Sequence, residues 1–242
     1  MPSVEEHYER LLAPYYSWIH GGADRQLSAY RTFFDRHAVQ PKDCGIALDL
    51  GAGSGFQSIP LAELGFQVIA IDISSALLGE LRQRAGGLSI VAIRDDLLRF
   101  THHSPAQAEV IVCMGDTLTH LHTLADVQHL ILDAGSRLAN GGRLFIGFRD
   151  MSVEAKDLER FIAVRSDTER IFTCFLEYEK MHVRVHDLVY ERCEDQWVLH
   201  KSFYRKLRLA TDWLQTQIEK AGLGIEHLDV HNGMTTLIAG KH

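Results

Sequence analysis

The chain is poor in cysteine and proline, and this scarcity narrows the class of protein. Its 242 residues include only four cysteines and five prolines. The cysteines, Cys44, Cys113, Cys174 and Cys193, show no close pairing, and three of them sit in or beside apolar runs. Free cysteine in such a setting packs as a small hydrophobic residue. We therefore expect reduced thiols in a cytoplasmic protein and no disulfide framework.

Long apolar runs and excess positive charge are also missing. No stretch approaches the length of a membrane span. The acidic N-terminal residues Glu5, Glu6 and Glu9 do not suit a signal peptide. A net charge of −7 and a pI of about 6.0 give no broad basic surface. We therefore predict neither a membrane nor a nucleic-acid partner, and the length suits one α/β domain with an insertion.

A glycine-rich loop lies between two apolar runs. Gly51, Gly53 and Gly55 end the first run, with Asp49 two residues before them, and Asp72 ends the second run. This order predicts strand, glycine loop, helix and strand. Gly51 and Gly53 allow positive φ and a close approach of a ligand. Asp72 at the end of its strand is suited to accept hydrogen bonds from a ribose diol.

The glycine spacing disfavours one class of nucleotide. A dinucleotide fingerprint needs its third glycine at position 56, which is Phe56. A nicotinamide-dependent oxidoreductase using the same loop therefore remains only as an alternative.

The N-terminal residues 1–40 predict helices with an aromatic stripe that includes Tyr16. Gly21-Gly22 interrupts the pattern. Such a stripe is more often core than ligand site. A helix before the first strand can also lie over the carboxyl edge of the sheet, so Tyr16, His20 and Arg25 are candidates for a lid over a ligand.

The rest of the chain continues the alternation of strands and helices until residue 150. We expect strands at 88–93, 109–114 and 143–148, and a helix at 125–138 that stops at the turn Asn140-Gly141-Gly142. After a helix from Thr211, residues 224–230 and 234–239 predict two closing strands.

Residues 151–208 break this alternation. Val183 and Val185 alternate with His182 and Arg184, and Trp197, Leu199, Phe203 and Leu207 continue a period of two. This pattern predicts an antiparallel β insertion with one packed face and one wet face.

The motif Asp49-Leu50-Gly51-Ala52-Gly53-Ser54-Gly55, with Asp72 at the end of the next strand, resembles motifs I and II of the class I S-adenosylmethionine-dependent methyltransferases. The resemblance covers residues 41–150 and 211–240. It implies a Rossmann-like α/β fold: a seven-stranded, mostly parallel sheet with an antiparallel closing strand, plus the β insertion after the fifth strand. The predicted division is a lid at 1–40, a core at 41–150 and 209–242, and an insertion at 151–208 that caps the substrate or mediates assembly.

The resemblance also implies a cofactor, S-adenosylmethionine, with S-adenosylhomocysteine as product. It places Asp96 at the adenine amino group, with Leu97 against the ring. The full set of expected cofactor contacts is Tyr16, His20, Arg25, Asp49, Gly51, Ala52, Gly53, Asp72, Ile73, Asp96, Leu97, Met114 and Gly115.

A closer resemblance, to glycine N-methyltransferase-like enzymes, comes from Cys113–Leu121 and Phe148-Arg149-Asp150. It implies Asp116, His120 and Arg149 as catalytic residues, with the arginine holding a substrate carboxylate. The chain departs from that family in having Asp116 where the family carries asparagine, which places glycine in doubt as substrate. We expect a small acceptor with one acidic and one basic end between Asp116 and Arg149, unless these two residues pair with each other.

Other functions and partners follow from the same residues. No Asn/Asp-Pro-Pro-aromatic motif follows the fourth predicted strand, which favours a small-molecule acceptor, methylated on nitrogen or oxygen, over DNA. The fourteen histidines do not show ligand spacing, so no metal is expected. A protein that binds S-adenosylmethionine without methyl transfer remains an alternative, and a homodimer remains open.

Overall fold

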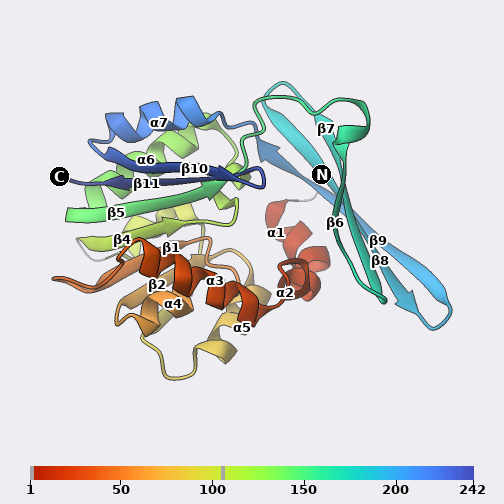
Figure 1. Cartoon of the computed structure of the whole chain (residues 1–242), viewed down its shortest axis with the longest axis horizontal. Coiled ribbons are helices and arrows are strands. Elements are labelled where there is room, and N and C mark those ends of the chain that lie inside the picture. Colours follow the sequence, from red (N-terminus) through yellow and green to blue (C-terminus); the bar gives the residue numbers. More distant parts are fainter. Residues whose placement is uncertain (1–2, 105–106) are drawn as a thin grey trace.

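The computed structural model describes residues 3–104 and 107–242, so the first two residues of the predicted lid and residues 105–106 of the predicted core lie outside it. The described chain contains a seven-stranded sheet and a four-stranded sheet (Figure 1). The strands of the large sheet run in the order β10-β11-β5-β4-β1-β2-β3. All neighbouring pairs in it are parallel except those that β11 makes with β5 and β10, which confirms the expected fold. The strands are β1 (Ile46–Leu50), β2 (Gln67–Asp72), β3 (Ile90–Arg94), β4 (Ala108–Cys113), β5 (Leu138–Phe148), β10 (Gly224–His231) and β11 (Met234–Gly240).

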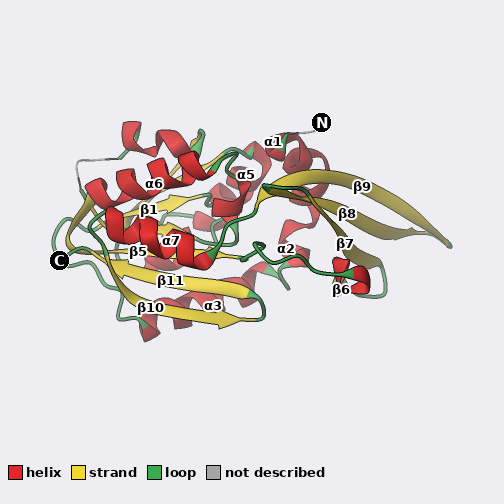
Figure 2. Cartoon of the chain, turned by 90° about the horizontal axis from the view of Figure 1, so that it is seen from above, coloured by secondary structure: helices red, strands yellow, loops and turns green. Residues whose placement is uncertain are grey.

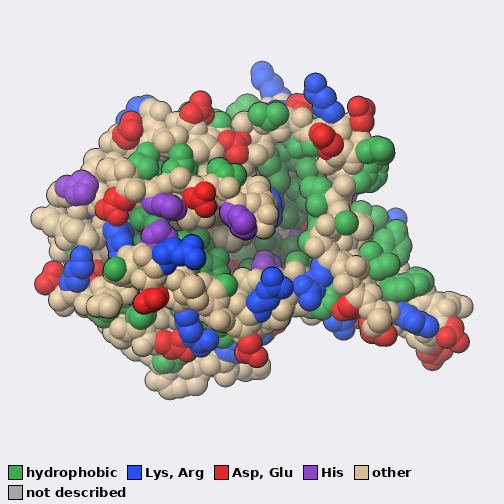
Figure 3. All heavy atoms as spheres, in the orientation of Figure 1, with side chains coloured by type: hydrophobic (Ala, Val, Ile, Leu, Met, Phe, Trp, Pro, Cys, Tyr) green, Lys and Arg blue, Asp and Glu red, His purple; other side chains and the backbone are tan. Residues whose placement is uncertain are grey.

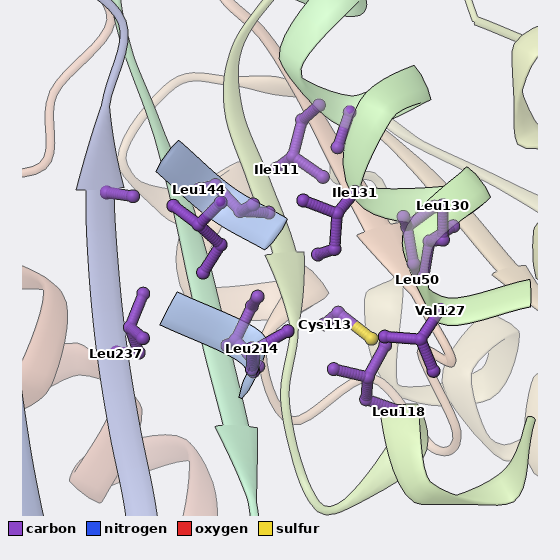
Figure 4. Packing of buried hydrophobic residues seen from close by; sticks show 14 of the residues in the cluster. Leu50, Ile111, Cys113, Leu118, Val127, Leu130, Ile131, Leu144, Leu214 and Leu237 are labelled. Atoms are coloured by element: carbon purple, nitrogen blue, oxygen red, sulfur yellow. The ribbon is translucent and has the colours of Figure 1, made fainter. Parts of the chain in front are cut away.

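Helices cover both faces of the large sheet (Figure 2). One face packs against α3 (Ala23–Arg36), α4 (Ser58–Glu63) and α5 (Ser75–Ala85), and the other against α6 (Leu124–Arg137) and α7 (Thr211–Lys220). Figure 4 shows the second of these cores, where Val127, Leu130 and Ile131 of α6 point toward the sheet. Their spacing places them on one side of the helix, and burial of each side chain contributes about 1.5–3 kcal/mol. The two cores hold the carboxyl ends of β1 to β5 at one edge.

The predicted turn before β5 was wrong, although the helix before it ends at Arg137, next to the expected Leu138. The sequence predicts a helix through Leu138 and a turn at Asn140–Gly142, whereas α6 ends at Arg137 and β5 already begins at Leu138. The glycines serve a close backbone approach inside the strand. A Cβ on Gly142 would lie 2.8 Å from the carbonyl oxygen of Ala139, and the β4–β5 register shifts here.

The insertion forms the second sheet, and the N-terminal segment lies between it and the core (Figures 1 and 2). Its antiparallel strands are β6 (Phe161–Ser166), β7 (Arg170–Tyr178), β8 (His182–Cys193) and β9 (Gln196–Leu207). The N-terminal segment runs through α1 (Val4–His7), a π-helical stretch (Tyr8–Leu12), a 3-10 turn (Ala13–Tyr15) and α2 (Tyr16–Ile19). Leu11 and Leu12 pack against Phe172 and Val189 of the sheet. The aromatic stripe of the N-terminal segment therefore packs between the two sheets.

The predicted alternation of β9 holds for Leu207, which is buried, but not for Trp197 and Leu199. Val183 and Val185 are buried as expected, but their partners in the register are Lys206 and Tyr204. Trp197 lies on the opposite face and is 48% exposed. The inward face of β9 thus carries a lysine and a tyrosine, whose polar groups need buried partners.

Candidate active site

A cavity of about 250 Å³ opens at the carboxyl edge of the large sheet, under the N-terminal segment. The loops after β1, β2, β3 and β4 supply its walls. This edge is where open α/β sheets bind ligands. The predicted site residues that line it are Tyr16, Gly51, Gly53, Asp72, Ile73, Asp96, Leu97, Gly115 and His120.

Two positions of the loop after β1, Gly51 and Gly53, require glycine. Gly51 has a φ of +80°, and a Cβ there would lie 2.2 Å from Thr117 Cγ2. Gly53 has a φ of +52°, and its added Cβ would lie 3.2 Å from the Tyr16 hydroxyl. These positions bring bare backbone to the cavity wall, facing Tyr16 and Thr117.

Asp72 lies at the end of β2 and is fixed by two backbone donors. Its carboxylate accepts from Gly53 N at 2.7 Å and from Ser74 N at 2.8 Å. Burial raises the pKa of this carboxyl above its usual range, and the two backbone donors oppose the shift. Each carboxylate oxygen has a second lone-pair direction, so the group can also accept from a ligand hydroxyl.

Two acids follow β3, and they have different partners. Asp95 accepts from His103 Nε2 at 2.7 Å, and this bond lowers the pKa of the Asp95 carboxyl. Asp96 is exposed at the cavity, where its Oδ1 accepts from Leu98 N at 2.9 Å. Of the pair, Asp96 is therefore better placed to accept from a ligand amino group.

The N-terminal segment covers the cavity with two tyrosines. Tyr8 and Tyr16 both line it. Glu9 ties the segment to the core, since its Oε1 accepts from Ser74 Oγ at 2.7 Å. The Tyr16 ring stacks on Phe56 with centroids 5.6 Å apart. The predicted lid position is therefore occupied, while closure on a ligand stays a prediction.

Several predicted cofactor contacts lie behind the cavity wall. His20 packs on the far side of Tyr16, with ring centroids 4.4 Å apart, and burial lowers its pKa. Arg25 is exposed on α3. Asp49 is buried and accepts from Ser58 Oγ at 2.6 Å, and burial raises its pKa to about 7. Ala52 and Met114 are buried and do not line the cavity. None of these five residues lines the cavity, and of them only His20 contacts a lining residue through its ring.

The structure does not bring the Arg149 side chain to the cavity. Its Nη1 donates to the carbonyl oxygen of Asn232 at 3.1 Å, in the turn between β10 and β11. Only its backbone N meets Asp116, donating to Oδ1 at 2.9 Å. The expectation that a substrate lies between the two side chains, and the alternative that they pair with each other, both disagree with this geometry.

The partner of Asp116 is Lys206, which sequence reasoning missed. Lys206 Nζ donates to Asp116 Oδ2, and both residues are buried. Asp116 has a φ of +73°, and its Oδ1 also accepts from Thr119 Oγ1 at 3.0 Å. The pair joins the core to the insertion. Its only sequence signal is that Lys206 falls in register with the apolar residues of β8.

Two more polar pairs, one buried and one partly buried, join the same three parts of the chain. The Tyr8 hydroxyl and His120 Nε2 are 3.2 Å apart and connect the N-terminal segment to the core. His7 Nε2 and Asp187 Oδ2 are 2.8 Å apart and connect it to the insertion. With the Asp116–Lys206 pair, these contacts tie lid, core and insertion into one polar network beside the cavity.

His120 is neutral in this network. Burial first, and then the Lys206 ammonium, lower its pKa to about 3. In the unfolded chain it titrates near 6.5. Its contribution to stability is therefore complete above pH 6.5 and is lost as the pH falls toward 3, by about 1.4 kcal/mol per pH unit. His120→Asn should flatten the pH dependence of the unfolding free energy between about pH 6.5 and 5, measured by urea denaturation.

The matched control for this prediction is His129→Asn, on the exposed side of α6, which should keep the wild-type slope. His20 and His37, whose pKa values are also lowered by burial, retain part of the slope in every variant. Equal slopes in wild type and His120→Asn would show that His120 protonates freely in the folded protein.

Among residues 3–104 and 107–242 there is no group of three or more His, Cys, Asp or Glu side chains that could hold a metal ion. In the same residues, no helix has the length and hydrophobicity needed to cross a membrane.

Part of the chain that forms this site is similar to known methyltransferases. Residues 47–142 match the family model described as "Methyltransferase domain". The glycine/sarcosine N-methyltransferase of Aphanothece halophytica is 29% identical over 105 residues, which are 43% of this chain and 40% of that protein. The matched segment spans less than half of the length of the curated relatives.

Solved structures match over nearly the whole chain. The CcbJ methyltransferase from Streptomyces caelestis has a TM-score of 0.78 at 16% identity, covering 97% of this chain and 98% of that one. CalS10 from Micromonospora echinaspora, an amino pentose methyltransferase with bound S-adenosylmethionine, has a TM-score of 0.68 at 17% identity, covering 93% and 94%. Residues 47–142 thus match a methyltransferase-domain model, and the chain as a whole shares the fold of these solved methyltransferases.

Proposed function

We propose that this protein transfers a methyl group from S-adenosylmethionine to a nitrogen or oxygen atom of a small molecule, with S-adenosylhomocysteine as the product. One observation carries the proposal: the cavity at the carboxyl edge is walled by the glycine loop, Asp72 and Asp96. The family match over the same segment supports it.

The residues present fit this cofactor. The missing Cβ at Gly53 leaves bare backbone opposite Tyr16. The carboxylates of Asp72 and Asp96 offer acceptors at the ends of neighbouring strands β2 and β3. Asp72 would accept from the ribose hydroxyls, Asp96 from the adenine amino group, and Leu97 would contact the ring. Ile73 and Gly115 would complete the wall.

S-adenosylmethionine, when bound, supplies an electrophilic methyl group for an in-line displacement. The chain mainly has to bind and orient the acceptor, which can account for roughly 7–11 kcal/mol of the barrier. His120 and Tyr8 line the cavity beside Gly115 and share a hydrogen bond. With a pKa near 3, His120 is a weak base, so we assign it to hold the Tyr8 hydroxyl, whose oxygen can accept a hydrogen bond from the acceptor and orient it.

Calorimetry with S-adenosylhomocysteine and NAD tests the cofactor. We expect micromolar binding of the first and none of the second, and Asp72→Ala should weaken binding by about 1–3 kcal/mol because it leaves ribose hydroxyls unpaired. Tight NAD binding without S-adenosylhomocysteine binding would favour the oxidoreductase alternative. Cofactor binding with no labelled methyl transfer to any amine or alcohol in a broad panel would favour a binding protein.

The predicted lid gives a second test. Tyr8 and Tyr16 line the cavity from the N-terminal segment, so a bound cofactor should hold that segment down. Amide hydrogen exchange across residues 8–30 should slow when S-adenosylhomocysteine is added, while exchange in β6 (Phe161–Ser166) should not change. Unchanged exchange across residues 8–30 would make the segment a packing element and not a lid.

A homodimer is also part of the proposal, formed through the outer face of the four-stranded sheet. Phe161, Phe175, His186 and Phe203 stand in a row across its strands, with successive ring centroids 4.8, 5.8 and 5.4 Å apart. Phe161 is 64% exposed, and hydrophobic side chains gather along this sheet in Figure 3. Phe161→Glu should therefore reduce the mass measured by light scattering. A monomeric wild type would leave residues 151–208 only the role of a substrate cap.

The proposal also covers the division of the chain into three parts and its cellular location. The division into a lid (1–40), a core (41–150 and 209–242) and an insertion (151–208) is supported by the separate four-stranded sheet that β6 to β9 form. A cytoplasmic location is supported by the four free cysteines.

A further inference from the structure

Resting on the proposed methyl transfer, we propose that Asp187 of the insertion is a positioning residue for the reaction. Through His7 it holds the Tyr8 hydroxyl beside His120, at the wall of the cavity. Asp187 itself does not line the cavity, so it acts on the acceptor only through these residues.

Tyr8 lies at a point of the N-terminal segment that has little local support. It follows α1, which has only four residues, and it begins the π-helical stretch Tyr8–Leu12. Such short helical pieces are not stable by themselves, and π-helical turns occur frequently at functional sites. The Tyr8 hydroxyl lies 3.2 Å from His120 Nε2, and both residues line the cavity. The position of this hydroxyl therefore depends on what holds the neighbouring residues.

His7, the residue before Tyr8, is fixed by a buried contact with the insertion. His7 and Asp187 are 0% and 1% exposed, and His7 Nε2 donates to Asp187 Oδ2 at 2.8 Å. The other oxygen of Asp187 accepts from Cys174 Sγ at 2.9 Å. The His7 ring lies against the Tyr204 ring, with centroids 4.3 Å apart. Strands β7, β8 and β9 thus all contribute to the place of His7.

Asp187 is the one hydrogen-bond partner of the His7 ring in the described part of the chain. His7 Nδ1 is buried without a partner there. Without the Asp187 carboxylate, Nε2 would be unpaired as well, and burial of an imidazole with two unpaired nitrogens is costly. His7 should then leave its position. Because the two residues are consecutive, Tyr8 would move with it, and its hydroxyl would part from His120.

The next turn of the segment has an anchor of its own. Leu11 and Leu12 are buried against the insertion. Their contacts are apolar, so they do not depend on the Asp187 carboxylate. Replacing Asp187 should therefore displace the Tyr8 hydroxyl and leave the segment docked, which separates a positioning role from a merely structural one.

Nuclear magnetic resonance of protein with isotope-labelled histidine, without ligand, tests this role. The ring-nitrogen signals of His120, identified by their loss in His120→Asn, report its hydrogen bond to Tyr8. Tyr8→Phe removes this bond and should shift the signals. Asp187→Leu should shift them in the same direction and to a comparable extent. Asp187→Asn, whose amide oxygen can still accept from His7 Nε2, should leave them near the wild-type position.

Turnover should follow the same order. For any amine or alcohol that wild type methylates, Asp187→Leu should lower kcat/KM roughly tenfold or more, as expected when an orienting group is misplaced. Asp187→Asn should retain most of the wild-type value. In a Tyr8→Phe background, Asp187→Leu should have little further effect, because both changes remove the same contact.

Glu191→Leu is the matched control. Glu191 lies on the same strand and also holds the N-terminal segment, since its Oε2 accepts from the Tyr15 hydroxyl at 2.9 Å. Its replacement should leave the His120 signals at their wild-type positions, because Tyr15 does not line the cavity. If Asp187→Leu does not fold, His7→Ala breaks the same contact from the other side and should shift the His120 signals.

Unchanged His120 signals in Asp187→Leu, with shifted signals in Tyr8→Phe, would overturn the proposal. So would a shift in Glu191→Leu as large as that in Asp187→Leu, or the absence of any shift in Tyr8→Phe. Failure to bind S-adenosylhomocysteine, or to methylate any acceptor, would instead count against the proposed function, because the resonance experiment needs neither.

Discussion

Replacing Lys206 by methionine is expected to destabilise the protein by about 3–5 kcal/mol, because it leaves the buried carboxylate of Asp116 without a counter-charge. Methionine retains much of the length of the lysine side chain, so the change tests the charge and not the packing. Urea denaturation at neutral pH measures the loss. It should be among the largest effects of any single substitution in this protein, since it breaks the contact between insertion and core.

Two variants make this prediction specific. Asp116→Asn/Lys206→Met removes both charges and should recover most of the lost stability. Lys201→Met changes an exposed lysine of the same strand and should alter stability by no more than about 0.5 kcal/mol. A loss below about 1 kcal/mol for Lys206→Met would mean that Asp116 is neutral or solvated in the folded protein.

Gly51→Ala is expected to lower the unfolding free energy by about 2–3 kcal/mol and to weaken S-adenosylhomocysteine binding by roughly tenfold or more. Gly51 has a φ of +80°, which disfavours any L side chain, and the new methyl group would lie 2.2 Å from Thr117 Cγ2. Thr117 itself lines the cavity, so its displacement changes the wall facing the ligand. Denaturation and calorimetry on the same preparation separate the two effects.

Gly79→Ala is the matched control for this substitution. Gly79 lies inside α5, has an ordinary φ and has no heavy atom within 4 Å of an added Cβ. The same chemical change should therefore stabilise the protein by about 0.5–1 kcal/mol and leave ligand binding unaltered. If Gly51→Ala behaved like Gly79→Ala, the glycine loop would not be required for the shape of the cavity.

The glycine loop and the sheet were predictable because their signals are local. Gly51, Gly53 and Asp72 lie within one βαβ unit, and the spacing of strand, loop and acid determines where each faces. Asp96 follows the same rule one strand later. Residues at the ends of neighbouring parallel strands meet at one edge, whatever lies elsewhere in the chain.

The part of the site where we propose that the acceptor binds was not predictable in the same way. Asp116 and Lys206 are separated by 90 positions, and Tyr8 and His120 by 112. Both pairs depend on how the insertion and the N-terminal segment pack against the core, which no local spacing determines. For Arg149 the local prediction was correct, because β5 ends at Phe148 as expected. The direction of the Arg149 side chain was not predicted, because it donates to the Asn232 carbonyl oxygen in a distant turn.

The orientation of β9 illustrates why hydrophobic alternation failed there. Both faces of this strand carry large side chains, with Trp197 and Phe203 on one and Tyr204 on the other. Alternation alone gives the period and not which face is inward. The face that carries Lys206 is the buried one, because Asp116 lies opposite this lysine and compensates its charge.

The most direct test of the central claim is a crystal structure of the protein soaked with S-adenosylhomocysteine. We predict density in the cavity above Gly53, with the ribose hydroxyls at Asp72, the adenine between Leu97 and Asp96, and Tyr16 over the ligand. Density for the ligand at any other place, or an unchanged cavity at millimolar ligand, would contradict the account.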